Sequence, residues 1–208
     1  MRCYIAGAGE FSGSEPPARD DFIIAADGGY AELARRGIIP DLVVGDFDSL
    51  TDVPRHPNIV RIAAEKDDTD MMLAVKYGFE RGCGSFVIDG GLGGRLDHTL
   101  ANIQLLAYIA QKGARGVLTG RDICVTAVSN GALRFEKGAC GYISVFCAGG
   151  AASGVTLTGL KYPLNDAVLK YDYPLGVSNE FTGVPAAVEV RAGTLIIMWV
   201  GGLRWLKD

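Results

Sequence analysis

Short apolar runs that end in glycine or aspartate recur through the first 120 residues, and this pattern constrains the fold most. The runs end in Gly-Ala-Gly at 7–9, Asp-Gly-Gly at 27–29, Gly-Asp-Phe-Asp-Ser at 45–49 and Asp-Gly-Gly at 89–91. Stretches with a helical spacing of apolar residues lie between several of them. Alternating strands and helices are typical of a mostly parallel α/β sheet, which binds ligands at the carboxyl ends of its strands. We therefore expect a Rossmann-like sheet domain with a ligand site at that edge.

The same pattern gives the expected bounds of the elements. We predict helices at 30–36, 70–80 and 96–111, and strands at 3–6, 22–26, 42–44, 59–62, 86–88 and 116–118. After about residue 123 valines, threonines and aromatic residues alternate, glycines are frequent, and no long helical period is visible. Strands predicted at 143–146, 155–157, 168–171, 187–190 and 195–200 indicate a smaller antiparallel β-sandwich. We place the two domains at 1–125 and 126–208.

The charge and cysteine content argue against several classes of protein. The net charge is −4 and no run of Lys or Arg forms a basic stripe, so nucleic-acid binding is not expected. An acidic protein still binds nucleotide phosphates when a metal ion bridges carboxylate and phosphate. The five cysteines are odd in number and have no Cys-x-x-Cys spacing, which predicts reduced, mostly buried thiols.

The apolar runs indicate a cytoplasmic protein without a membrane segment. No basic stretch followed by an apolar stretch opens the chain, so no secretory signal is predicted. The longest apolar runs, such as 195–200, are far too short to span a bilayer.

Two aspartates spaced by one residue, Asp46 and Asp48, form the strongest candidate for chemistry. In extended backbone, residues i and i+2 point to the same side, so both carboxylates face one point. Converging carboxylates repel each other unless a cation lies between them, and Mg²⁺ favours one or two carboxylates with waters and phosphates. The alternative is that these side chains only make turn hydrogen bonds.

A second acidic cluster, Asp67, Asp68 and Asp70, precedes the helix expected at 70–80. Thr69 or Asp68 is suited to cap this helix, and Asp70 suits its first turn. Capping explains one or two of these acids but not three within four residues. The carboxylates that do not cap the helix make this position suitable for a divalent cation.

Four glycines fall within residues 90–94 and are followed by Arg95, Asp97 and His98. A glycine-rich loop between a strand and a helix lets backbone N–H groups contact phosphate, although this one matches neither a Walker loop nor a Gly-x-Gly-x-x-Gly motif. Arg95 is suited to a bidentate phosphate contact, and Asp97 could add to a metal site. His98 is either a capping or packing group or a general base. The segment 176–181 alone reads as a polar turn between strands.

In order and spacing, these stretches resemble the thiamin pyrophosphokinase family. The resemblance rests on AADGG at 25–29, PDLVVGDFDS at 40–49, EKDDTD at 65–70 and GGLGGRLDH at 90–98 with Asn102. It extends to GLKYPL at 159–164 and GVSNEF at 176–181, and so covers nearly the whole chain. It implies an α/β nucleotide-binding catalytic domain, a β-sandwich thiamin-binding domain, and a homodimer with the substrate site near its interface.

The resemblance also implies the reaction and the residues that carry it. Diphosphate passes from Mg·ATP to the thiamin hydroxyl, giving thiamin diphosphate and AMP. Asp46, Asp48 and Asp70 hold Mg²⁺, with Arg95 and Asp97 as further catalytic residues. Ser178 and Asn179 bind thiamin, to which we also assign His98, and an aromatic residue such as Trp199, Trp205 or a tyrosine stacks on it. The residues that position ATP are Asp27, Gly28, Gly29, Asp68, Thr69, Gly93, Gly94, Arg95, Asn102 and Thr119.

Two alternatives remain open at this point. One is a related pyrophosphokinase for a pterin or another hydroxymethyl heterocycle, which needs the aspartates but not a pocket at Ser178 and Asn179. The other is a nucleotide- or thiamin-binding protein without catalysis, which has no reason to concentrate so many acids.

Overall fold

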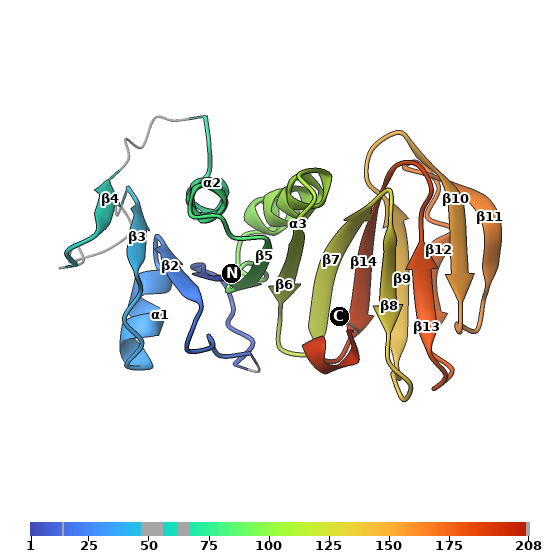
Figure 1. Ribbon diagram of the computed structural model, residues 1–208, viewed down its shortest axis with the longest axis horizontal. Helices are drawn as coiled ribbons and strands as arrows, with labels where there is room; N and C mark the ends of the chain where they lie inside the picture. The colour runs from blue at the N-terminus through green and yellow to red at the C-terminus, as the bar shows by residue number, and fades with distance from the viewer. Residues whose placement is uncertain (14, 47–55, 62–66, 207–208) are drawn as a thin grey trace. The chain divides into compact units, whose positions relative to one another are not determined.

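The computed structural model describes residues 1–13, 15–46, 56–61 and 67–206. These residues form a mixed α/β protein with a large sheet and a second, antiparallel sheet (Figure 1). The chain divides into two compact units. Unit 1 comprises residues 1–102 and 118–121, and unit 2 comprises residues 103–117 and 122–208. Among the described residues, no helix is long and apolar enough to cross a membrane.

Five parallel strands form the framework of unit 1. They are β1 (Arg2–Ala6), β2 (Phe22–Ala26), β3 (Leu42–Gly45), β4 (Ile59–Arg61) and β5 (Ser85–Asp89), in the order β5-β1-β2-β3-β4. Residues 3–6 of β1 and 86–89 of β5 are all buried, as expected for strands with both faces covered. Helices α1 (Gly29–Arg35) and α2 (Asp70–Glu80) lie on opposite sides of these strands (Figure 1).

The longest helix, α3 (Leu96–Gln111), begins in unit 1 and continues in unit 2 from Ile103. Strand β6 (Arg115–Thr119) is divided in the same way, with its last two residues in unit 1. All six strands and three helices predicted in the first 120 residues are confirmed, with ends that agree to within one residue where the structure describes them.

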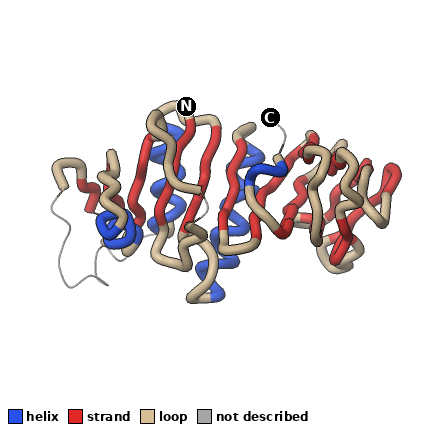
Figure 2. Tube along the Cα trace, turned by 90° about the horizontal axis from the view of Figure 1, so that it is seen from below, coloured by secondary structure: helices blue, strands red, loops and turns tan. Residues whose placement is uncertain are grey.

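Unit 2 is built from antiparallel strands. Strands β7 (Ile123–Ser129), β9 (Tyr142–Cys147), β12 (Gly176–Glu180) and β14 (Thr194–Val200) run in the order β12-β9-β14-β7. The second sheet has the order β11-β10-β13-β8, from β8 (Ala132–Phe135), β10 (Ala151–Thr158), β11 (Leu164–Lys170) and β13 (Ala186–Glu189). In the described part of residues 122–206, the one helical segment is Leu203–Trp205 (Figure 2).

One hydrophobic core joins the strands of unit 2. Phe135 makes edge-on contacts with Phe181, at 4.9 Å between ring centres, and with Trp199, at 5.5 Å. The indole of Trp199 is only 1% exposed, so it packs the core and is not available to stack on a ligand.

All five cysteines are free thiols, and four of them are buried, which confirms the prediction.

The sequence predicted the antiparallel character of this half but not all of its strands. Strands β7, β8 and β12 were not predicted, and the interpretation of residues 176–181 as a polar turn is wrong. These residues form β12, an irregular strand whose register against β9 shifts between Gly176 and Asn179. Ser178 takes a positive φ of 58° there. The irregularity removes the alternation of apolar and polar residues by which a strand is recognised in a sequence.

Candidate active site

The strand order of unit 1 locates a crevice between β1 and β5. Strands β2, β3 and β4 follow on one side of β1, whereas β5 lies on its other side. The register pairs Ala6 with both Ala25 and Asp89, so the carboxyl ends of β1, β2 and β5 lie together. In open α/β sheets the ligand binds outside the carboxyl ends of the strands where the strand order reverses.

A cavity of about 560 Å³ opens at this point of unit 1. Its volume is within the range of small-molecule and cofactor sites. Its wall combines glycines with acidic residues and one arginine, and consists of residues 7–9, 26–27, 67–71, 90–91, 93–95, 98 and 102. The structure thus brings together most of the residues that the sequence assigned to the nucleotide.

Two loops form the glycine-rich wall of the cavity, the N-terminal loop (residues 7–12) and the glycine loop (residues 90–94). Their backbones are paired by hydrogen bonds from Gly9 N to Gly90 O, at 2.7 Å, and from Glu10 N to Leu92 O, at 2.8 Å. A Cβ added to Gly7 would lie 2.5 Å from Gly90 O, and one added to Gly90 would lie 2.7 Å from Gly7 O. Only glycine allows this approach, so main-chain atoms alone line the cavity at these two positions.

The acidic wall comes from Asp27 at the end of β2 and from residues 67–70 before α2. Thr69 is the N-cap of α2, and its hydroxyl accepts a hydrogen bond from Met72 N at 3.1 Å. Asp68 pairs with Lys76 at 2.5 Å, and Asp70 lies in the first helical turn. The expected capping role therefore belongs to Thr69, which leaves the carboxylates of Asp67, Asp68 and Asp70 on the cavity wall.

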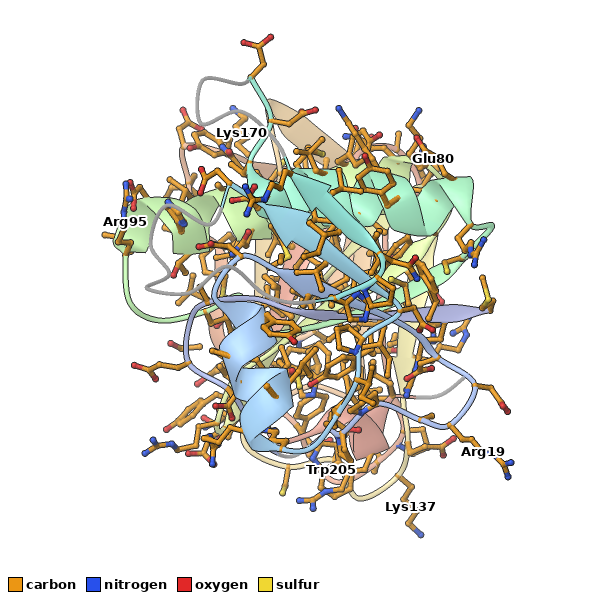
Figure 3. The ribbon with its side chains drawn as sticks, turned by 90° about the vertical axis from the view of Figure 1, so that its left-hand side faces the viewer. Arg19, Glu80, Arg95, Lys137, Lys170 and Trp205 are labelled. Atoms are coloured by element: carbon orange, nitrogen blue, oxygen red, sulfur yellow. The ribbon has the colours of Figure 1, made fainter. Side chains whose placement is uncertain are left out.

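Arg95 and Asp97 form an ion pair at the start of α3. The guanidinium donates from Nε to Oδ1 at 3.1 Å and from Nη2 to Oδ2 at 2.6 Å. Arg95 holds the pKa of the Asp97 carboxyl below its usual value. Both side chains are exposed, and Figure 3 shows Arg95 directed away from the ribbon. Arg95 and His98 line the cavity, whereas the described cavity wall does not include Asp97.

The predicted metal ligands are only partly covered by the described residues. Asp46 directly follows β3 and is partly buried, Asp70 lines the cavity, and Asp48 lies outside the described residues. Within the described ranges, no group of three or more His, Cys, Asp or Glu side chains converges as a metal site. The chemistry of the donors nevertheless suits Mg²⁺, which binds through one or two carboxylates completed by waters and phosphate oxygens.

Of the remaining predicted nucleotide residues, Asn102 lines the cavity and Gly28, Gly29 and Thr119 do not. Asn102 is buried and lines the cavity, and its Nδ2 donates to Gly91 O at 2.7 Å. Thr119 is only 1% exposed, and its hydroxyl donates to Ile88 O at 3.4 Å. Gly28 and Gly29 begin α1, and neither they nor Thr119 belong to the cavity wall given by the described residues.

The predicted thiamin residues Ser178 and Asn179 lie on β12 in unit 2. Asn179 is buried, and its amide is bonded to the backbone of Tyr162: Oδ1 accepts from Tyr162 N at 2.9 Å, and Nδ2 donates to Tyr162 O at 2.7 Å. Ser178 is exposed, and its N–H donates to Ser144 Oγ at 3.1 Å. Asn179 thus shapes the segment around Tyr162, whose own ring is 58% exposed.

The sequence did not assign the N-terminal residues 7–9 to the site, although they line the cavity. It also missed Asp89 at the end of β5, which is not on the described cavity wall but is bonded to both of its loops. Its carboxylate is fully buried and accepts hydrogen bonds from both the N-terminal loop and the glycine loop. The signal that would have found it is the repeated Asp-Gly-Gly at 27–29 and 89–91. The sequence analysis assigns only the first of these aspartates, Asp27, to the site.

Comparison with known proteins explains the combination of this cavity with an antiparallel second unit. Residues 17–118 match the model of the thiamin pyrophosphokinase catalytic domain, and residues 132–195 match that of the thiamin pyrophosphokinase vitamin B1 binding domain. The thiamine pyrophosphokinase of Bacillus subtilis (strain 168) is 34% identical over 182 residues, covering 84% of this chain and 85% of the relative. The chain belongs to the thiamin pyrophosphokinase family.

Solved structures agree with this assignment. The crystal structure of thiamine pyrophosphokinase from Bacillus subtilis has a TM-score of 0.84 and 29% sequence identity, covering 98% of this chain and all of the other. That of a thiamin pyrophosphokinase family protein from Enterococcus faecalis has a TM-score of 0.83 and 28% identity, covering 97% and 100% of the two chains. The resemblance inferred from the motifs is therefore confirmed for the family and for the mixed α/β fold.

Proposed function

We propose that this chain transfers the diphosphate group of Mg·ATP to the hydroxyl of thiamin, giving thiamin diphosphate and AMP. The observation that carries the proposal is the cavity where the order of the parallel strands reverses, lined by glycine-loop backbone, acids and one arginine in a chain of the thiamin pyrophosphokinase family. Neither the related pyrophosphokinase nor the binding protein without catalysis gains support from the comparisons, which name thiamine pyrophosphokinases.

On this proposal, residues 1–125 are a Rossmann-like nucleotide-binding catalytic domain and residues 126–208 are a β-sandwich domain that binds thiamin. The division is supported by the two family models, at 17–118 and 132–195, and the boundary itself falls within β7 (Ile123–Ser129). The expected cytoplasmic location stays a prediction.

The triphosphate of ATP lies along the paired loops on this proposal. Backbone N–H groups of the glycine loop contact phosphate oxygens, as in other glycine-rich strand–helix turns. Gly93 and Gly94 suit this role because both have positive φ, 79° and 62°. Arg95 exchanges its pairing with Asp97 for a bidentate phosphate contact, which opposes the negative charge that develops during transfer. Asp27 and Asn102 position the nucleotide from the opposite wall and the floor.

Asp46, Asp48 and Asp70 hold Mg²⁺ on this proposal, with Asp97 near the same charge cluster. The bound ion neutralises charge on the phosphates and polarises the phosphorus toward attack. This role suits the composition of the site, because aspartates outnumber arginine on the cavity wall. By holding the ion, these carboxylates would set where the phosphates bind, so positioning and electrostatics would carry the reaction without covalent catalysis by the protein.

Thiamin binding falls to Ser178, Asn179 and His98 on this proposal. The contacts of Asn179 with the backbone of Tyr162 support an indirect contribution, in which the amide holds the segment that faces the ligand. Exposed tyrosines in unit 2, such as Tyr162 and Tyr142, are better candidates for stacking than the buried Trp199.

A homodimer is part of the same proposal. Unit 2 exposes several large apolar side chains, which an interface between two copies would remove from water. They are Tyr142, Tyr162, Val168, Tyr171, Tyr173, Leu175 and Val177. We expect light scattering at micromolar concentration to give about twice the chain mass of 22.0 kDa. A mass equal to that of one chain would contradict the proposal.

Incubation of the protein with Mg²⁺, ATP and thiamin tests the reaction directly. We expect AMP and thiamin diphosphate to form in equal amounts, and no AMP to form when thiamin is left out. Formation of ADP would identify an ordinary kinase instead. Turnover with a hydroxymethyl pterin but not with thiamin would identify the related pyrophosphokinase, and binding of ATP without turnover would identify a binding protein.

A further inference from the structure

A cluster of hydrogen-bonded side chains around one buried carboxylate adjoins the cavity wall and takes no part in the reaction described above. It is centred on Asp89, the last residue of β5, whose side chain is 0% exposed. Tyr4, on the neighbouring strand β1, is 1% exposed and donates its hydroxyl to Asp89 Oδ2 at 3.1 Å. A buried carboxylate is costly unless it is well hydrogen-bonded, so its retention at this position needs a reason.

The hydrogen bonds of Asp89 come from both loops of the cavity wall. Oδ1 accepts from Ser12 N at 2.7 Å and from Gly90 N at 3.0 Å. Oδ2 accepts from the Ser12 hydroxyl at 3.1 Å in addition to that of Tyr4. Ser12 ends the N-terminal loop and Gly90 begins the glycine loop, so one carboxylate joins the far end of the first loop to the near end of the second.

The backbone of Asp89 continues this connection. Its carbonyl accepts from Gly7 N at 2.8 Å, the first residue of the N-terminal loop. The N-terminal loop is therefore attached to Asp89 at both of its ends. Between these points it pairs with the glycine loop through Gly9 and Glu10. Gly7, Gly9 and Gly90 contribute no side-chain packing to the loops, whereas the ring of Phe11 lies close to Gly90 and 4.8 Å from the Arg36 guanidinium.

The surroundings of Tyr4 keep its phenol protonated. Burial and the neighbouring Asp89 carboxylate raise the pKa of the Tyr4 phenol far above its usual value, so the phenol remains a neutral donor. Together with the Ser12 hydroxyl it supplies the donors that a buried carboxylate requires.

From this arrangement we infer that Asp89 is a positioning residue for the nucleotide, which holds the N-terminal loop and the glycine loop at the spacing that the triphosphate needs. It acts through the two loops and does not itself contact a phosphate. The inference rests on the proposed binding of Mg·ATP in this cavity. It predicts that loss of the Asp89 carboxylate raises the KM for Mg·ATP and leaves the KM for thiamin largely unchanged.

Two substitutions at Asp89 separate hydrogen bonding from shape. In Asp89→Asn, the retained oxygen still accepts from Ser12 N and Gly90 N, and the new amide can donate to the hydroxyls of Tyr4 and Ser12, which rotate to accept. In Asp89→Leu the size is similar, but the two buried backbone N–H groups lose their acceptor. We expect the KM for Mg·ATP to rise about tenfold or more in Asp89→Leu, since each unsatisfied buried donor is costly. In Asp89→Asn it should stay within about threefold of wild type.

Steady-state kinetics with both substrates, calorimetric binding of Mg·ATP without thiamin, and hydrogen exchange of the loop amides test the inference together. The expected result for Asp89→Leu is a higher KM and Kd for Mg·ATP, an unchanged KM for thiamin, and faster exchange at Gly9, Glu10 and Ser12. Ser12→Ala removes one hydroxyl donor from a loop, where folding is not in question, and should raise the KM for Mg·ATP by a smaller factor, about threefold.

Thr126→Val is the matched control. Thr126 is 0% exposed, and its hydroxyl donates to Gly116 O at 2.6 Å, so this substitution also removes a buried hydrogen bond, but within unit 2. It should lower stability without changing the KM for Mg·ATP. Equal rises in both KM values for Asp89→Leu, or unchanged exchange of the loop amides, would overturn the inference. A wild-type chain that fails to bind Mg·ATP would instead overturn the proposed function and the nucleotide part of this inference with it.

Discussion

The Asp46→Asn variant should lose turnover while it keeps its fold. We expect kcat to fall about 10²-fold or more, because the amide oxygen carries no charge with which to hold a divalent cation against the phosphates. The free energy of unfolding should change by less than about 1 kcal/mol, since Asp46 lies at a strand end outside the core. Initial rates at saturating Mg²⁺, ATP and thiamin, with urea unfolding of the same preparations, measure both quantities. Asp48→Asn should behave in the same way.

Asp41→Asn provides the matched control for Asp46→Asn. Asp41 precedes β3 where Asp46 follows it, so the same charge is removed at the opposite end of one strand. The Asp41 carboxylate accepts from Ile23 N at 2.8 Å, a structural contact remote from the carboxyl ends of the strands. This variant should retain turnover. If Asp46→Asn turns over normally at saturating Mg²⁺, Asp46 does not hold the metal.

The second large effect concerns Arg95. Arg95→Ala should lower kcat about 10²-fold or more, because a guanidinium that contacts the transferred group stabilises the charge of the transition state. Arg95→Lys should recover only part of this loss, since a lysine keeps the charge but not the bidentate geometry. Single-turnover rates with Mg·ATP and thiamin separate this effect on the chemical step from effects on product release.

Arg134→Ala is the corresponding control, because Arg134 is also exposed and also paired with an acid, Glu189, at 3.2 Å. It lies in unit 2 on β8 and should leave kcat unchanged. Asp97→Asn tests the other half of the ion pair. If Asp97 takes part in catalysis, kcat of the Asp97→Asn variant should fall, although by a smaller factor than kcat of Arg95→Ala. An unchanged kcat in Asp97→Asn would mean that Asp97 only pairs with Arg95 in the absence of substrate and has no part in catalysis.

The sequence predicted the parallel half of the fold almost completely because nearly every strand there is a short apolar run closed by glycine or aspartate. Residues 22–26 and 96–111, for example, were predicted with the ends that the structure gives them. The antiparallel half was harder to predict. Strand β8 alternates in burial but is only four residues long, which is too short to stand out in the sequence. The register of β12 shifts around Ser178, which interrupts its alternation.

For the site, spacing along the chain predicted which residues gather but not what each one contacts. The acids before α2, the glycine loop and Arg95 do line one cavity. A sequence does not show that Asn179 is committed to the backbone of Tyr162, because the partner lies 17 residues away on another segment. The same reason hides Asp89, whose partners Tyr4 and Ser12 are 85 and 77 residues distant. Such pairs follow from strand order, which local patterns do not encode.

The paired glycine loops have a consequence for how this enzyme family is studied by mutagenesis. Their lining is main chain, held at a distance that excludes any side chain at Gly7 or Gly90. An alanine scan cannot remove a backbone N–H group, and at these glycines it adds atoms instead of deleting them. The scan will therefore report steric damage at the loops, and it will not detect the main-chain groups that we propose to contact the phosphates. Backbone amide-to-ester replacement, which deletes a single N–H donor, is the experiment that can detect them.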